Sequence, residues 1–163
     1  MRTRKNSLRL NNFDYSSPGM YFITVCAQNR MEIFGEINNE KMILNDFGLI
    51  VQKYIRNISS ERIRIEEFIL MPNHVHILIS IIAGAVHEPP LQRRQMLIPK
   101  IIGKFKMQSA KEINIIRKTP GMRVWQRGYH DHIVRNMDDC IKIKRYILDN
   151  PGNWFKDKNF SEM

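Results

Sequence analysis

Two histidines separated by a single valine are the residues of this chain best suited to metal chemistry. They occur in the segment Met-Pro-Asn-His-Val-His-Ile-Leu-Ile at 71–79, which is rich in strand-forming residues. Alternate side chains of an extended strand share a face, so His74 and His76 point one way while Val75 points the other. Two imidazoles held on a rigid strand form half of a metal site before any metal binds.

A tyrosine and an asparagine near the end of the sequence can complete such a site. Tyr146 and Asn150 are four residues apart in a predicted helix, so they lie on one helix face with Cβ atoms ~5–6 Å apart. If that helix lies over the histidine strand, two imidazoles, an amide oxygen and a phenol converge. Imidazole and carbonyl groups suit Mn²⁺ or another borderline divalent ion, and Mg²⁺ is the second choice because it prefers oxygen ligands.

The phenol of Tyr146 suggests attack on phosphorus. A tyrosine with an ordinary pKa of about 10 is ionised at pH 7 only at a cost of roughly 4 kcal/mol. A metal ion that polarises a phosphate would offset this cost. Attack by tyrosine on a DNA phosphodiester conserves the bond energy as a phosphotyrosine, so the break can be resealed, whereas hydrolysis by water would not allow this.

A second histidine pair and a second tyrosine compete for these roles. His130 and His132 flank an aspartate, but no Met-Pro-Asn turn precedes them and no apolar run follows, so we expect a pair that is either simply exposed or near DNA. Tyr129 has no carboxamide four residues further on, which favours a structural or base-stacking role.

The elements that must position these groups follow from hydrophobic periodicity and capping residues. Asn45 and Asn136 are expected to cap helices that end near residues 57 and 150. The remaining predicted elements are a third helix at 98–117, strands at 21–26, 63–70 and 74–81, a hairpin at 33–44, and a further strand or strand pair around 124 and 133–134.

The order β, hairpin, α, β, β, α, β, α contains no repeat and indicates a single domain over residues 1–163. About residues 1–12 are expected to form a flexible basic arm. The predicted fold class is α+β, with a ferredoxin-like antiparallel sheet, helices packed on one face of it, and a small extra hairpin.

Composition favours an intracellular protein that binds a polyanion. The net charge is +10, for which nucleic acid is the first candidate partner and a membrane surface the weaker one. Cys26 and Cys140 form no CxxC motif, which suits a reducing compartment. The longest apolar stretch is well short of the ~20 residues of a membrane span. We therefore expect a cytoplasmic, nucleoid-associated protein without a membrane segment.

The positive charge is concentrated in residues 91–127, which hold ten lysines and arginines and one acid, Glu112. In the helix predicted at 98–117, the apolar residues fall within a ~120° sector, and a stripe of lysines lies opposite. Such a stripe can follow a phosphate backbone. The residues predicted to bind DNA are Arg93, Arg94, Lys100, Lys104, Lys111, Lys118, Arg123 and Arg127.

Taken together, these motifs resemble the single-tyrosine transposases that carry the HUH signature (His, bulky hydrophobic, His). Met71–His76 resembles that signature. The segment Trp125-Gln126-Arg127-Gly128-Tyr129, followed by Tyr146-Ile147 and Asn150-Pro151, resembles the REP-associated branch of the family, as does Tyr21–Arg30. The resemblance covers nearly the whole chain. An HxH pair alone is a weak signal, and the full set in this order is a strong one.

The resemblance implies Mg²⁺- or Mn²⁺-dependent cleavage and rejoining of single-stranded DNA, with recognition of a DNA hairpin of the REP or insertion-sequence type. It implies a 5′-phosphotyrosine intermediate on Tyr146 and metal ligation by His74, His76 and Asn150. Asn150 stands where insertion-sequence relatives usually carry glutamine. Either a monomer with a site formed within one chain, or a homodimer that exchanges the tyrosine helix, is consistent with the family.

Two other functions compete with a transposase. A non-catalytic regulator derived from such an enzyme would bind hairpins without cleaving them. A zinc- or manganese-dependent hydrolase unrelated to DNA is the third alternative, and the basic surface argues against it.

Overall fold

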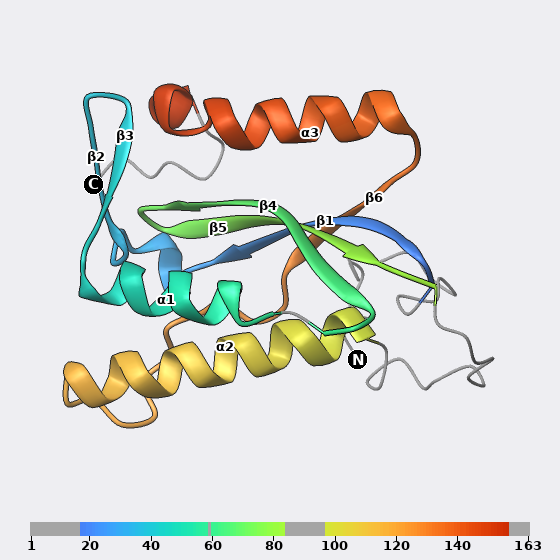
Figure 1. Ribbon diagram of the computed structural model, residues 1–163. Coiled ribbons are helices and arrows are strands. Elements are labelled where there is room, and N and C mark those ends of the chain that lie inside the picture. The colour runs from blue at the N-terminus through green and yellow to red at the C-terminus, as the bar shows by residue number, and fades with distance from the viewer. Residues whose placement is uncertain (1–16, 59, 84–96, 157–163) are drawn as a thin grey trace, which may run out of the picture.

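The computed structural model describes residues 17–58, 60–83 and 97–156 (Figure 1). The expected basic arm at 1–12, together with Arg93 and Arg94 of the predicted DNA-binding set, lies outside these residues. None of the helices in the described ranges combines the length and the apolar character that a membrane span requires.

A four-stranded antiparallel sheet in the order β4-β5-β1-β6 forms the centre of the fold. Its strands are β1 (Gly19–Cys26), β4 (Ile63–Met71), β5 (His74–Ile81) and β6 (His130–Val134). The predicted strands are therefore confirmed, except that Val124 lies outside any strand. The β1–β5 register places Thr24 directly opposite His76.

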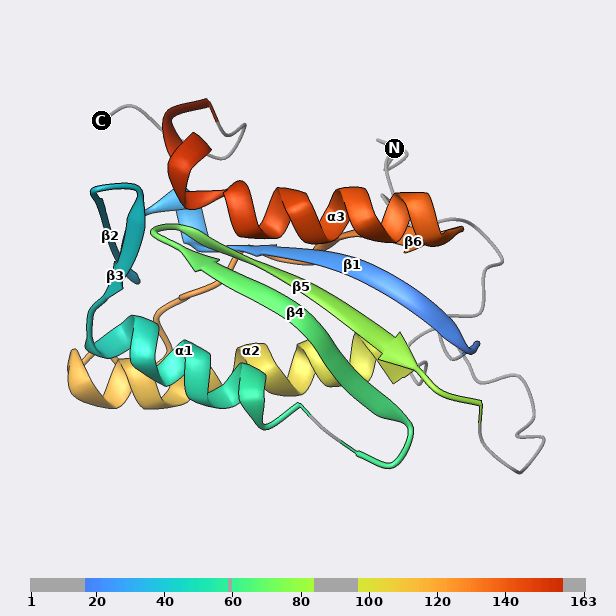
Figure 2. The ribbon, with the colours of Figure 1, turned by 45° about the horizontal axis from the view of Figure 1, so that its top comes forward.

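Helices α1 (Asp46–Arg56) and α2 (Leu97–Ile116) cover one face of this sheet, as Figures 1 and 2 show. With the four strands they make the β-α-β-β-α-β order of a ferredoxin-like fold. The main hydrophobic core lies between them and the sheet. It contains Ile23 of β1, Ile77 of β5 and Phe105 of α2, all of which are buried.

Helix α3 (Met137–Asp149) covers the opposite face of the sheet (Figure 2). The prediction that the helices pack on one face is therefore wrong for this helix, although the antiparallel sheet is confirmed. The reason is that the sheet carries apolar residues on both faces. Ile77 and Ile79 of β5 face α1 and α2. On the other face, Leu78 of β5 and Phe22 of β1 belong to a second, smaller core with Cys140, Ile143 and Ile147 of α3. A sheet that is apolar on both faces needs a cover on each.

The predicted extra hairpin is also confirmed, as β2 (Gly35–Asn38) and β3 (Lys41–Leu44). Both predicted caps form: the Asn45 side chain accepts a hydrogen bond from the backbone N–H of Gly48, and that of Asn136 from the N–H of Asp139. Two short 3₁₀ helices were not predicted, η1 (Gln28–Arg30) and η2 (Pro151–Lys156).

The small core beneath α3 should determine whether this helix stays docked. Ile147 is 1% exposed in that core, whereas the neighbouring Leu148 is 67% exposed. We expect Ile147→Ala to lower the free energy of unfolding by about 2–4 kcal/mol in urea denaturation, because it leaves a cavity between helix and sheet. Leu148→Ala, the matched control, should change it by less than about 0.5 kcal/mol. Equal effects of the two substitutions would contradict the packing described here.

Candidate active site

The two histidines of β5 lie side by side on the face of the sheet that α3 covers. His74 and His76 are both fully buried, with ring centroids 4.5 Å apart and Nε2 atoms 2.9 Å apart. This confirms that they share a face. It also shows that both rings turn their Nε2 atoms toward one common point.

Each imidazole is oriented by a hydrogen bond at its other nitrogen. Nδ1 of His74 lies 2.8 Å from Oδ1 of Asn73, and Nδ2 of Asn73 donates to the carbonyl oxygen of Arg30. Nδ1 of His76 lies 2.8 Å from the hydroxyl of Thr24. With the protons on Nδ1, both Nε2 atoms present lone pairs, which is the tautomer that binds a metal through Nε2.

Tyr146 extends from α3 toward this pair. Its hydroxyl lies 3.2 Å from Nε2 of His76, and its ring packs edge-on against Phe22 of β1. The side chain is nevertheless 40% exposed, so the phenol is in contact with both the histidines and the solvent. A solvent-open hollow of about 450 Å³ adjoins it, lined in part by Lys142, Arg145 and Lys156.

Asn150 lies one turn beyond Tyr146, at the C-cap of α3. It is 2% exposed, and its Oδ1 is buried without a hydrogen-bond partner among the residues that the structure describes. A buried carbonyl oxygen left without a partner costs about 1–3 kcal/mol. Coordination of a bound metal ion by this oxygen would explain why the protein leaves it without a hydrogen bond.

The set of donors fits a divalent cation of borderline hardness. Two nitrogens at right angles around one ion, each at ~2.1 Å, are about 3 Å apart, which agrees with the 2.9 Å between the two Nε2 atoms. A buried carbonyl oxygen of Asn150 can supply a third ligand. Within the described ranges no group of three histidine, cysteine or acidic side chains offers an alternative site.

Several residues of this site were not predicted from the sequence. Asn73 belongs to the Met-Pro-Asn motif, but the sequence alone indicates no role for its side chain. The position of Thr24 beside His76 follows from the β1–β5 register, which no local sequence pattern reveals. Trp154 of η2 stacks on the His74 ring with centroids 5.9 Å apart and an interplanar angle of 26°, and only the fold brings it there. Lys142, Arg145 and Lys156 beside the tyrosine were also missed.

The competing histidine pair and tyrosine lie elsewhere. Nε2 of His132 is 2.8 Å from a carboxylate oxygen of Asp139, at the start of α3, and this hydrogen bond holds the pKa of the Asp139 carboxyl below its usual range. His130 is exposed on the edge strand β6. Tyr129 is buried in the main core, on the α2 side of the sheet, which favours the structural role.

The described residues of the predicted DNA-binding set belong to α2 and the segment that follows it. Lys100, Lys104 and Lys111 are exposed on α2, across the sheet from α3 (Figures 1 and 2). Lys118 lies beyond the last helical residue with φ of 54°, so it does not continue the helical stripe as predicted. The other exposed members of the set are Arg123 and Arg127.

Comparison with known proteins identifies the family. A family model described as Transposase IS200 like matches residues 16–150, and the chain belongs to this family. An uncharacterized protein of Haemophilus influenzae (strain ATCC 51907 / DSM 11121 / KW20 / Rd) is 37% identical over 168 aligned positions, which cover 94% of this chain and 92% of that protein.

Two solved structures share the fold. One is a REP-associated tyrosine transposase bound to a REP hairpin, with a TM-score of 0.64 and 17% identity, covering 94% of this chain and 77% of that one. The other is a proposed transposase from Deinococcus radiodurans R1, with a TM-score of 0.51 and 17% identity, covering 86% of this chain and 97% of that one.

The unpartnered oxygen of Asn150 gives a test that separates function from stability. Asn150→Leu keeps the approximate volume and removes no hydrogen bond of Oδ1. We expect the free energy of unfolding in urea to stay within ~1 kcal/mol or to rise. The affinity for Mn²⁺, measured by titration calorimetry, should fall at least tenfold because one ligand is lost.

Asn114→Leu is the matched control. Asn114 is also buried, but its Nδ2 donates to the carbonyl of Met122 and its Oδ1 accepts from Arg117. This substitution should destabilise the protein by about 1–3 kcal/mol and leave Mn²⁺ affinity unchanged. A strongly destabilised Asn150→Leu with normal Mn²⁺ affinity would contradict the assignment of Asn150 as a ligand.

Proposed function

We propose that this protein is a metal-dependent transposase of the REP-associated branch, which nicks and rejoins single-stranded DNA beside hairpins. The observation that carries the proposal is the 3.2 Å separation between the partly exposed hydroxyl of Tyr146 and Nε2 of His76. Membership of the IS200-like transposase family supports the reaction class. The likeness in fold to a transposase bound to a REP hairpin supports a hairpin as the partner.

His74, His76 and Asn150 would hold Mg²⁺ or Mn²⁺ through two imidazole nitrogens and an amide oxygen. When bound, the ion would polarise the scissile phosphate and offset negative charge in the transition state. The residues around the ligands hold them in place. Asn73 and Thr24 fix the imidazole orientations, and Trp154 covers the outer face of one ring.

Tyr146 would be the nucleophile. Its oxygen attacks the phosphorus of a phosphodiester, an O–P bond to tyrosine forms, and the bond from phosphorus to the 3′-oxygen breaks. The phenol gives up its proton to solvent, the departing 3′-oxygen takes one up and leaves as a 3′-hydroxyl, and the 5′-phosphate remains on the enzyme. Because one phosphodiester has replaced another, a second 3′-hydroxyl can attack the phosphotyrosine and reseal the strand. The exposed side of the phenol gives the DNA access to it.

The hollow beside Tyr146 would hold the DNA strand that is cut. Lys142, Arg145 and Lys156 line it, with one acid, Asp149, among the lining residues. Cations in this position would attract backbone phosphates and bring one of them to the phenol. Because Tyr146 lies 3.2 Å from His76 of its own chain, we propose a site formed within a monomer.

Tyr146→Phe should abolish a covalent protein–DNA adduct. Purified protein would be incubated with labelled single-stranded hairpin oligonucleotides and Mn²⁺, and the adduct detected by denaturing electrophoresis. We expect no adduct from this variant, because the phenylalanine ring keeps the packing on Phe22 but has no nucleophile, and hairpin affinity should change less than about twofold. Tyr129→Phe is the matched control and should form the adduct normally.

Each alternative outcome of this experiment has a distinct meaning. An adduct that persists in Tyr146→Phe and disappears in Tyr129→Phe would move the nucleophile to the core tyrosine. Tight hairpin binding by the unmodified protein, without an adduct at any Mn²⁺ concentration, would contradict the transposase proposal and favour the non-catalytic regulator.

Thr24 offers a test of how the metal site is supported. Thr24→Val replaces the hydroxyl beside Nδ1 of His76 with a methyl group of similar size. Loss of such a supporting partner typically lowers metal affinity or activity 10- to 100-fold. We expect the Mn²⁺ concentration for half-maximal adduct formation to rise about tenfold or more, and Thr24→Ser to restore it. An unchanged Mn²⁺ dependence in Thr24→Val would show that this hydroxyl does not orient the ligand.

A further inference from the structure

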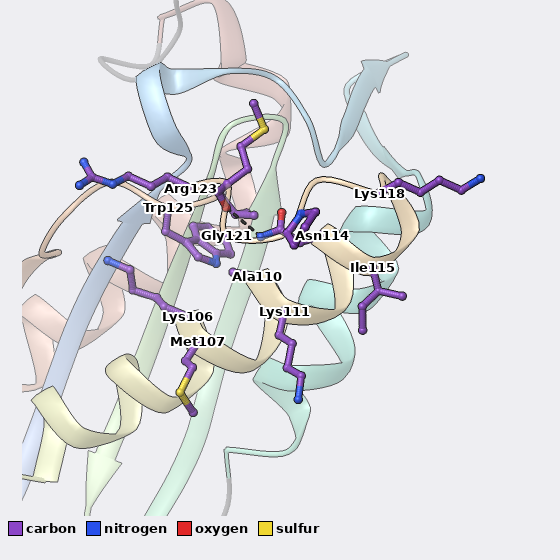
Figure 3. Close-up of a pocket in the computed structure, with 13 residues that line it drawn as sticks. Lys106, Met107, Ala110, Lys111, Asn114, Ile115, Lys118, Gly121, Arg123 and Trp125 are labelled. Carbon is purple, nitrogen blue, oxygen red and sulfur yellow. Dashed lines mark hydrogen bonds between the residues drawn. The ribbon is translucent and has the colours of Figure 1, made fainter.

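A second hollow, of about 800 Å³, lies on the α2 side of the sheet (Figure 3). The C-terminal half of α2 forms one wall, and the segment from Lys118 to Trp125 forms the other. Figure 3 shows Ala110, Asn114 and Trp125 at its centre. Tyr146 belongs to α3, on the other side of the sheet, so this hollow is separate from the candidate active site.

Hydrogen bonds within the protein hold the hollow in shape. Nδ2 of Asn114 donates to the carbonyl of Met122, and its backbone carbonyl accepts from the N–H of Thr119. The indole N–H of Trp125 donates to Ser109, and Gly121 makes the turn with φ of 78°. The cavity is therefore preformed, and the side-chain amide on its floor is already engaged by the protein.

The surface of the hollow combines exposed apolar side chains with unpaired cations. Met107, Ile115 and Met122 are 65%, 67% and 56% exposed. Lys111, Lys118 and Arg123 stand at the rim, and within the described ranges none of their three side chains makes a hydrogen bond or an ion pair. No carboxylate is among the described residues that line it. The hollow thus suits a ligand with an apolar, flat part and an anionic part.

We propose that this hollow binds an unpaired nucleobase of the DNA, with its neighbouring phosphates on Lys111, Lys118 and Arg123. The assignment rests on the proposed DNA function and extends it to a contact away from the cleavage site. Bases bind apolar surfaces through their π-faces regardless of sequence, and methionine side chains adapt to flat ligands of different outline. Because the Asn114 side-chain amide is already hydrogen-bonded within the protein, it does not read the edge of the base. The hollow therefore binds any unstacked base, and the identity of the base contributes little to the affinity.

The test is an abasic scan of a hairpin oligonucleotide, read by fluorescence anisotropy with the full-length protein. We expect one unpaired position at which removal of the base weakens binding roughly tenfold. Replacing that base with another should change the affinity less than about threefold. Ile115→Ser should weaken binding of the intact hairpin by a similar factor and make the protein insensitive to the abasic substitution, because the same contact has been removed twice.

Ile116→Ser is the matched control, since Ile116 is 51% exposed in the same turn of α2 but does not line the hollow. It should bind as the unmodified protein does. Lys111→Gln should reduce the slope of log affinity against log salt by about 0.7–0.9. Under saturating DNA, Ile115→Ser should still form the Tyr146 adduct.

The outcomes separate this inference from the proposed function. Normal DNA binding by Ile115→Ser, with an unchanged response to every abasic position, would overturn the nucleobase assignment. The hollow would then bind a protein or another apolar partner. Absence of any salt-sensitive hairpin binding by the unmodified protein would overturn the proposed function itself. An adduct formed normally by Ile115→Ser alongside weakened binding would support both.

Discussion

Two imidazole nitrogens 2.9 Å apart in a buried site are the constraint on which the rest of this structure depends. When both rings carry their proton on Nδ1, toward Asn73 and Thr24, both lone pairs face one point, and a cation between them stabilises this arrangement. Within the described part of the chain, the Asn150 side-chain oxygen has no hydrogen-bond partner. The protein thus holds two imidazole nitrogens and an amide oxygen in fixed positions, as expected of a site that binds an ion.

The fold supports this site by burying both faces of the central sheet. Helices α1 and α2 cover the face that carries the large core, and this fixes β1 and β5. Helix α3 covers the other face through Leu78, Cys140, Ile143 and Ile147. The same helix carries Tyr146 and Asn150 on its flank, so the packing that docks the helix also sets the distance between the phenol and the histidines. The stability of the fold and the geometry of the candidate site therefore depend on one small apolar cluster.

The sequence was sufficient to predict the groups that local periodicity brings together. The alternation of a strand placed His74 and His76 on one face, and helical spacing placed Tyr146 and Asn150 together. The predicted antiparallel sheet, hairpin and helix caps are confirmed. The single-face packing of helices was wrong because the sheet also carries apolar side chains on its second face, including Phe22 of β1 and Leu78 of β5, and α3 covers them. Thr24 and Trp154 could not be predicted, since their positions follow from strand register and from the chain's path after Pro151.

The positive charge is distributed over two faces of the molecule. The lysine stripe of α2 lies across the sheet from Tyr146, while Lys142, Arg145 and Lys156 surround the tyrosine. One face would then hold the hairpin and the other would hold the strand that is cut.

The most direct test of the central claim is an anomalous difference map from a crystal grown with Mn²⁺. A single strong peak within bonding distance of His74 Nε2, His76 Nε2 and Asn150 Oδ1 is predicted. A peak at His130 and His132, with none at the β5 pair, would contradict the account.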